Sequence, residues 1–443
     1  MFGLAKFSRN RRGLLAKGED PALAYSTILV LTGLYIAQAI PIYLVAAALP
    51  AIFREQGISL VAIGSLAILM LPWVLKFLWA PIVDRYYFKS IGKRRSWIIP
   101  AQLISVVIVL ILAGLDPAQD QKLLFPLLMM LALSSATQDI ATDGYAVEHL
   151  PDVWQPLGNA IQGGSVAAGV LLGGSLSLFM HDMFGWSVAL GSAATLSFLA
   201  LLPILFTKEA TGLRKDASFE CAFSAKPSIF TFFSSRNSLI ILCFAMLFRL
   251  PEGLIKGVEQ AFLVDFGFSL SQIGVVSGGS AACVGLGGSA AAVVVIKKFG
   301  LRTFLWTVGG LRTLCFAGYA AVALVAYEGF AVLVALSAAN TFIRYMEIVG
   351  LYSAFMRSSS LRQAGTDFTI LSCANLLVYM LGSISAGAIG QYLGYGPLFS
   401  LATTLSLLGI AVSMAFFDRA YKPSEPSDTS AKPTLTTSTL STK

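Results

Sequence analysis

The sequence predicts an all-helical integral membrane protein with twelve transmembrane helices in two six-helix pseudo-repeats and with both termini in the cytoplasm. Three observations carry this prediction: the composition, the distribution of Lys and Arg, and a weak internal repeat. Of the 443 residues, 56% are hydrophobic and only 12% are charged, whereas about a quarter of the residues in a soluble domain are charged. So few charges cannot cover a soluble surface of this size, and the soluble classes are excluded.

Twelve apolar runs are long enough to cross the membrane, because a helix needs about 20 mostly apolar residues to span roughly 30 Å of hydrocarbon. We predict transmembrane spans at residues 24–52, 60–83, 96–114, 123–147, 159–180, 187–206, 237–264, 270–296, 303–326, 329–356, 366–392 and 396–417.

Lys and Arg lie almost entirely on one side of these spans. With the N-terminus placed in the cytoplasm, the cytoplasmic segments contain 24 of these residues, and the opposite loops contain only Arg54 and Lys122. Cytoplasmic loops of membrane proteins carry this excess of positive charge. The net charge of +8 therefore reflects topology, and we predict no binding of nucleic acid.

The order of spans and polar segments predicts the domain boundaries. A tail rich in Ser, Thr and Pro has too little apolar surface to fold and is expected to be disordered. The predicted units are a cytoplasmic N-terminal segment (1–23), a first six-helix half (24–206), a cytoplasmic loop (207–236), a second half (237–418) and the tail (419–443).

Two short motifs recur between the halves. The segment 57–64 recurs as 267–274, and Ala132–Ala136 recurs as Ala335–Ala339. Each recurrence joins one span to the span six later, which favours duplication of a six-helix unit.

Ten charged side chains fall inside the predicted spans. Each would cost about 2.5–3.5 kcal/mol at the centre of a bilayer, so we expect them to face a polar cavity or one another. They are Lys76, Asp139, Asp143, Arg249, Glu252, Lys256, Glu259, Arg312, Arg344 and Glu347.

A basic motif between the second and third spans identifies a candidate family. Asp84-Arg85-Tyr86 followed by Gly92-Lys93-Arg94-Arg95 resembles the cytoplasmic signature of the major facilitator superfamily, Gly-x-x-x-Asp-Arg-x-Gly-Arg-Arg, with extra residues inserted. The resemblance implies the fold of that superfamily. It also implies that Asp84, Arg85, Arg94 and Arg95 act as gating residues that hold the cytoplasmic side shut. Topology alone would also place basic residues here.

In that superfamily the first, fourth, seventh and tenth helices line a central cavity, and most of the charges inside the spans lie at helical spacing on the last three of these. We therefore predict substrate-binding side chains at Tyr35, Gln38, Lys76, Gln138, Arg249, Lys256, Asn340 and Arg344. Carboxylates removed from water take up protons more readily, so we predict proton-coupling residues at Asp139, Asp143, Glu252 and Glu347. The alternative is that these charges are structural ion pairs, for example between Glu252 and Lys256.

Longer motifs narrow the resemblance. The segment 71–85 and the segment 138–145 resemble signatures of the branch that contains the AmpG-type muropeptide permeases and the eukaryotic acetyl-CoA transporters. The segment 138–148 and the segment 250–253 most resemble the RhtX/FptX siderophore permeases. The resemblance implies a monomeric, multi-pass permease of the bacterial inner membrane that imports an iron-siderophore complex from periplasm to cytoplasm by alternating access, with protons as the coupling ion.

Other functions stay open at this point. Within transport, the alternatives are an anhydromuropeptide permease and a carrier of nucleotide thioesters, and outside transport a membrane sensor or scaffold. Two histidines and no nucleophile constellation argue against an enzyme. The sequence has no phosphate-binding loop of the Gly-x-x-x-x-Gly-Lys-Ser/Thr form. Its cysteines are widely spaced, and we expect no metal and no cofactor.

Overall fold

The computed structural model describes residues 21–55, 66–117, 119–207, 226–268, 272, 280–325 and 329–420, and the regular elements in these ranges are helical. Within them, ten helices are long and apolar enough to cross a membrane. The predicted N-terminal segment, most of the loop after residue 207, the predicted tail and the ends of two predicted spans (60–65 and 270–279) lie outside the described residues.

The first half of the chain begins with α2 (Pro21–Tyr43), which continues through a π-helical segment, η2 (Leu44–Ala48), into α3 (Leu49–Glu55). Two long helices follow a broken segment, and the half ends with three more. These elements are α7 (Arg95–Ala113), α8 (Gln121–His149), α9 (Gln155–Gly169), the π-helical η5 (Val170–Ser175), α10 (Leu176–Phe184) and α11 (Trp186–Phe206).

The second half begins with the short α13 (Ile229–Ser234) and ends with the longest helices of the chain. Its elements are α14 (Arg236–Lys256), α15 (Glu259–Asp265), α17 (Ser280–Val325), α18 (Phe330–Ser358), α19 (Ala364–Leu393) and α20 (Tyr395–Ala420).

The second predicted span is built from short pieces. They are η3 (Leu66–Met70), α5 (Leu71–Leu75), η4 (Lys76–Leu78) and α6 (Ala80–Arg85). Pro72 and Pro81 each stand in the first turn of a piece, where a missing N–H is tolerated but continuation of the preceding helix is not. The breaks place Lys76 in a one-turn segment between two helices.

The eighth and ninth predicted spans are described as one element, α17, which contains a non-helical residue at Gly300 (φ 80°, ψ 161°). Gly288 faces the Phe342 backbone of α18, and Gly318 faces the Leu336 side chain of the same helix. In a straight helix these two glycines would be about 45 Å apart, while Leu336 and Phe342 are about 9 Å apart. The chain therefore folds back at Gly300, where glycine tolerates a left-handed φ.

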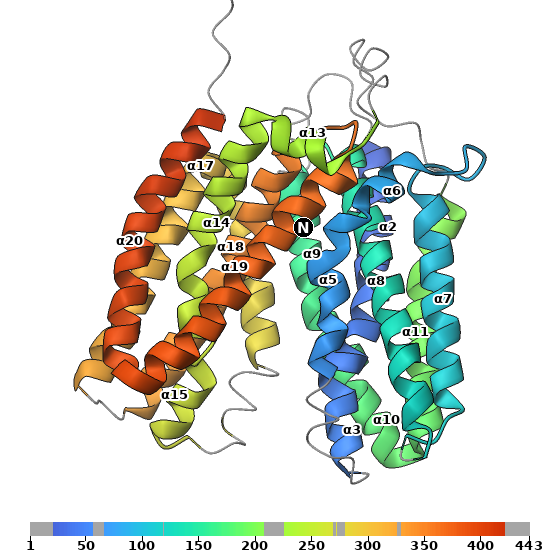
Figure 1. The fold of residues 1–443 in the computed structure, drawn as a ribbon, viewed down its shortest axis with the longest axis horizontal. Helices are drawn as coiled ribbons and strands as arrows, with labels where there is room; N and C mark the ends of the chain where they lie inside the picture. Colours follow the sequence, from blue (N-terminus) through green and yellow to red (C-terminus); the bar gives the residue numbers. More distant parts are fainter. Residues whose placement is uncertain are drawn as a thin grey trace, which may run out of the picture.

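The helices form two bundles side by side (Figure 1). In the first, α2 packs against α9 and α11, and in the second, α14 packs against α19 and α20. The bundles meet where α9 contacts α17 and α18 and where α19 contacts α6 and α8. Figure 1 places α6 and α13 at one end of the molecule and α3, α10 and α15 at the opposite end.

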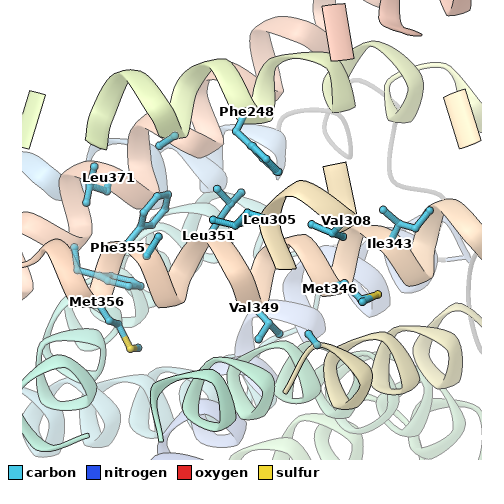
Figure 2. Packing of buried hydrophobic residues seen from close by; sticks show 14 of the residues in the cluster. Phe248, Leu305, Val308, Ile343, Met346, Val349, Leu351, Phe355, Met356 and Leu371 are labelled. Atoms are coloured by element: carbon cyan, nitrogen blue, oxygen red, sulfur yellow. The ribbon is translucent and has the colours of Figure 1, made fainter. Parts of the chain in front are cut away.

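An apolar core surrounds α18 (Figure 2). Phe248 of α14 and Leu305 of α17 gather with Leu351 on one side of α18, and Val349 and Met356 point to the other side. All five side chains are buried. This helix therefore presents apolar surface to neighbours on both sides.

The first and fifth predicted spans pack closely together where the fifth span has glycine. The π-helical segments η2 and η5 lie in contact, and a Cβ atom on Gly173 would overlap the Ile40 carbonyl oxygen of α2. Small residues permit this approach between membrane helices. Gly173 of the fifth predicted span therefore packs directly against the backbone of the first.

We expect Gly173→Ala to lower stability by about 1–3 kcal/mol, because the added methyl group meets a rigid backbone. Thermal unfolding of the detergent-solubilised protein measures the effect. Gly191→Ala is the matched control, since its Cβ atom would meet nothing within 4 Å. Equal melting temperatures for the two variants would contradict the proposed close contact.

Candidate functional site

Lys76 lies between two aspartates of α8. Its ammonium group donates to Asp139, and the Nζ atom is 3.8 Å from Oδ2 of Asp143. Gln38 of α2 also donates to Asp139, and the Tyr35 hydroxyl donates to Oδ1 of Asp143 at 3.1 Å. We call these five residues the lysine cluster.

Three elements, α2, η4 and α8, build this cluster, and all five members are buried. Asp139 and Asp143 are one turn apart on α8 and so share a face. Gln162 of α9 lies beside this cluster and donates to Oδ1 of Asp143 at 3.2 Å. Gln162 is not among the predicted site residues. The available signal was its position on a glycine-rich helix face, one turn before Ser165 and Val166.

Gln138 is placed differently. It is fully buried, and within the described ranges its side-chain amide has no hydrogen-bond partner. The structure therefore does not bring Gln138 into the lysine cluster, because consecutive residues on a helix point about 100° apart.

A second set of charges lies in the other half. Glu252 of α14 accepts from Arg249 on the same helix, and its Oε1 atom is 3.0 Å from Nε of Arg344 on α18. The guanidinium groups of Arg249 and Arg344 lie 5.1 Å and 5.4 Å from the centre of the Tyr379 ring of α19. We call these four residues the arginine cluster.

Two closed ion pairs flank the arginine cluster. Arg312 of α17 lies 3.0 Å from Glu347 and also donates to the Phe248 carbonyl oxygen at 2.7 Å. Lys256 pairs with Glu259, which also accepts from the Tyr319 hydroxyl at 2.6 Å.

The suggested pair between Glu252 and Lys256 is therefore wrong. Glu252 binds the two arginines, and Lys256 reaches Glu259 across the two turn residues that separate α14 from α15. Asn340 lies beside Glu259, with Nδ2 3.5 Å from its Oε1. The predicted residues Lys256 and Asn340 thus belong to a pair separate from the arginine cluster.

Tyr352 of α18 connects the two clusters. This side chain lies within electrostatic range of Lys76, Asp139 and Asp143 of the first half and of Arg249 of the second half. The lysine and arginine clusters therefore lie on either side of Tyr352 at the interface between the halves. Tyr352 is not among the predicted site residues.

Formal charges differ between the two clusters. The lysine cluster has one cation and two carboxylates, and the arginine cluster has two cations and one carboxylate. An unbalanced charge in low dielectric is costly. The first cluster is therefore suited to taking up a proton, and the second to taking up an anion.

Asp84 connects the halves at the end of α6. Its carboxylate accepts from the Thr366 backbone N–H and hydroxyl at 2.6 Å each and from the Gly365 N–H at 3.3 Å. These donors are at the N-terminus of α19, where the helix dipole favours a negative charge. A carboxylate of the first half is therefore held by the second half.

Arg94 orients this carboxylate from the first half. Its Nη2 atom is 2.7 Å from Oδ1 of Asp84 and 2.7 Å from Oε1 of Glu148, and Lys93 also contacts Glu148 at 2.7 Å. Burial alone would lower the pKa of Arg94, but the carboxylates of Glu148 and Asp84 outweigh burial and raise it. The guanidinium group therefore stays charged at any physiological pH.

The other two predicted gating arginines lie elsewhere. Arg85 is exposed and stacks over the Tyr86 ring at 5.0 Å, and Arg95 donates to the Leu205 carbonyl oxygen at 3.2 Å. Arg85 follows Asp84 directly and so points to a different side of the helix end. Glu148 and Thr366 supply contacts to Arg94 and Asp84 that the motif did not predict.

Other residues also make contacts between the halves. Asn159 of α9 donates to the Ser353 hydroxyl of α18 at 3.1 Å, and the buried Cys373 thiol donates to the Trp73 carbonyl oxygen at 3.4 Å. A separate, largely apolar cavity of about 440 Å³ opens between α2, α9 and α17. Its lining contains none of the charged residues of the two clusters.

Comparisons with known proteins find membrane transporters that are similar to this chain. Residues 27–182 match a family model described as acetyl-coenzyme A transporter 1. The chain is 27% identical over 297 residues to the anhydromuropeptide permease of Escherichia coli K12, covering 66% of this chain and 60% of that protein. It is 22% identical over 388 residues to a Rickettsia felis transporter named AmpG 4, covering 86% of this chain and 94% of that protein.

The fold is similar to that of solved transporters. The crystal structure of FucP, a major facilitator superfamily transporter in the outward conformation, superposes with a TM-score of 0.63 at 14% identity, covering 89% of this chain and 99% of that chain. The chain therefore has the fold of the major facilitator superfamily transporters, and its sequence is similar to the AmpG and acetyl-CoA transporter families. The predicted location in the bacterial inner membrane is confirmed.

We expect Asp84→Asn to loosen the contact between α6 and α19. Losing one charge-assisted hydrogen bond of about 1.5 kcal/mol or more shifts the population of the separated state by about tenfold. In a variant that keeps only Cys373, a membrane-impermeant maleimide should then label this buried thiol about tenfold faster in inside-out vesicles.

Arg85→Gln is the matched control, because Arg85 is adjacent in sequence but exposed. Its labelling rate should equal that of the parent. An unchanged rate in Asp84→Asn would show that this carboxylate does not hold the halves together.

Proposed function

We propose that this chain is an inner-membrane permease that imports anhydromuropeptide-type cargo into the cytoplasm by alternating access, coupled to protons. The two helical bundles are the moving halves, and the contact of Asp84 with α19 closes the cytoplasmic side. The relatives named as anhydromuropeptide permease and AmpG transporter support this cargo. The Escherichia coli permease is longer than the matched region, since the alignment covers 60% of it.

Twelve transmembrane crossings are part of this proposal. The structure has ten candidate spanning helices. One of them, α17, folds back at Gly300, and the broken segment from Leu66 to Arg85 has the length of a further crossing. Counting α17 as two spans and the broken segment as one gives two sets of six, with both ends of the chain on the same side.

The lysine cluster is the observation that carries proton coupling. Lys76 can neutralise only one of the two aspartates that it faces, and both aspartates are buried. Two carboxylates that share one cation in low dielectric retain a proton more readily than either would alone. A site of this kind can load a proton on one side of the membrane and release it on the other when solvent access changes.

Iron-siderophore import has no support from the comparisons. The motifs that suggested it are in the fourth and seventh predicted spans, and the motif in the fourth span also resembles the AmpG branch. Sequence motifs within single helices reflect helix packing and ion coupling. The choice of cargo depends instead on side chains that line the cavity and come from many helices. The matched family model favours a second candidate cargo, acetyl-coenzyme A, which is also bulky, polar and anionic.

Uptake of radiolabelled anhydromuropeptide tests the proposal. Cells that lack their own permease should accumulate the cargo when they express this chain, and an uncoupler should abolish accumulation. Accumulation that persists in the presence of the uncoupler would overturn the proposed proton coupling. No uptake by cells in which the protein reaches the membrane would overturn the cargo, and acetyl-coenzyme A and ferric siderophores would be tested next.

We expect Asp143→Asn to separate binding from coupling. The variant keeps the contact between Lys76 and Asp139 but removes the unbalanced carboxylate. Accumulation driven by a gradient of one pH unit should fall by about tenfold, the proton activity ratio that such a gradient stores. Counterflow of labelled cargo, which needs no net proton movement, should persist.

Asp182→Asn is a suitable control because Asp182 is exposed at the end of α10. Gradient-driven accumulation should be normal in this variant. Normal accumulation in Asp143→Asn as well would contradict a role for the lysine cluster in coupling.

A further inference from the structure

Among the described residues, no carboxylate neutralises one of the two positive charges of the arginine cluster. Glu252 is shared between Arg249 and Arg344. The neighbouring carboxylate, Glu347, is occupied by Arg312, a buried side chain that also donates to the Phe248 carbonyl oxygen. One cation of the cluster is therefore left without a carboxylate of its own among the described residues.

Other parts of the chain near the cluster do not supply the missing charge. The groups that face Arg344 from α2, α18 and α19 are tyrosines, Tyr43, Tyr345 and Tyr379. Lys256 and Glu259 form a pair that is neutral in total. Residues 269–279, which precede α17, contain no ionisable side chain.

The cluster also has open donors. Arg249 is only 5% exposed, and its Nε atom has no hydrogen-bond partner in the described part of the chain. The Arg344 side chain is 29% exposed, and its buried Nε atom has no hydrogen-bond partner in the described part of the chain. Buried donors without partners are costly, and a carboxylate ligand would satisfy both the donors and the excess charge.

We propose that Arg249 and Arg344, placed over the Tyr379 ring, bind one carboxylate group of the transported cargo. This inference rests on the proposed function, since the peptide part of an anhydromuropeptide has free carboxylates. Guanidinium groups bind carboxylates through two parallel N–H donors. The Tyr379 ring beneath both groups holds them in place by cation–π contact. Glu252 keeps the two arginines together without neutralising them both.

The position of the cluster fits a site for cargo. Tyr43, which faces Arg344, is on α2 of the opposite half. Tyr352 lies within electrostatic range of Arg249 and also of Lys76, Asp139 and Asp143. An anion bound here therefore lies at the interface between the halves.

The experiment compares two forms of one cargo in cells that lack their own permease. Radiolabelled anhydromuropeptide with free peptide carboxylates is measured against the same molecule with those groups converted to carboxamides. The parent protein should take up the acid form at least about tenfold faster, because hydrogen bonds to charged groups contribute that much. Arg344→Gln should take up both forms at equal rates, and Arg344→Lys should keep part of the preference.

Arg302→Gln is the control, because Arg302 is an exposed arginine that pairs with Asp418 away from the cluster. It should keep the full preference for the acid form. Immunoblots of membranes verify that each variant is inserted, and Arg344→Lys keeps the test valid if Arg344→Gln fails to fold.

The outcomes separate this inference from the proposed function. Equal uptake of both forms by the parent would overturn the carboxylate site and leave the permease proposal standing. A preserved preference in Arg344→Gln would also overturn it. Uptake of neither form by the parent would overturn the proposed cargo and, with it, the carboxylate that this site is inferred to bind.

Discussion

A charged side chain inside a bilayer is tolerated only beside a partner or a polar space, and this constraint organises the centre of the molecule. Charged residues are found on α8, α14, α17 and α18 and on the broken segment that contains Lys76. Each of these charges lies beside an opposite charge in the structure. The partners come from different helices in most cases, so the pairs also fix which helices are neighbours.

The two clusters have opposite imbalances. One half has an extra carboxylate and the other an extra guanidinium group, with Tyr352 between them. A proton on the first cluster and a carboxylate on the second would make each of them neutral. Neutral clusters cost less to enclose in low dielectric than charged ones. Under the proposed function, a transporter built this way would move most easily with both sites filled, which would link the cargo to the proton without direct contact between them.

Much of the fold could be predicted, because apolar length and charge asymmetry act locally. The predicted span 187–206 corresponds to α11, Trp186–Phe206, almost residue by residue. The eighth and ninth spans were harder, since nothing local distinguishes a glycine that reverses a helix from one that packs against a neighbour. The candidate site could be predicted only where local sequence spacing determines the contacts. Helical spacing placed Asp139 with Asp143, but the partner of Lys256 and the outward direction of Arg85 depend on breaks and neighbours that spacing does not encode.

Gly300 has a consequence for biosynthesis. The reversal takes place at a single non-helical residue between two helical arms, so no long loop separates the arms of α17. A pair of apolar helices joined so tightly is expected to partition into lipid as a single hairpin. Lys297, Lys298 and Arg302 flank the turn, and they orient both arms at once during insertion.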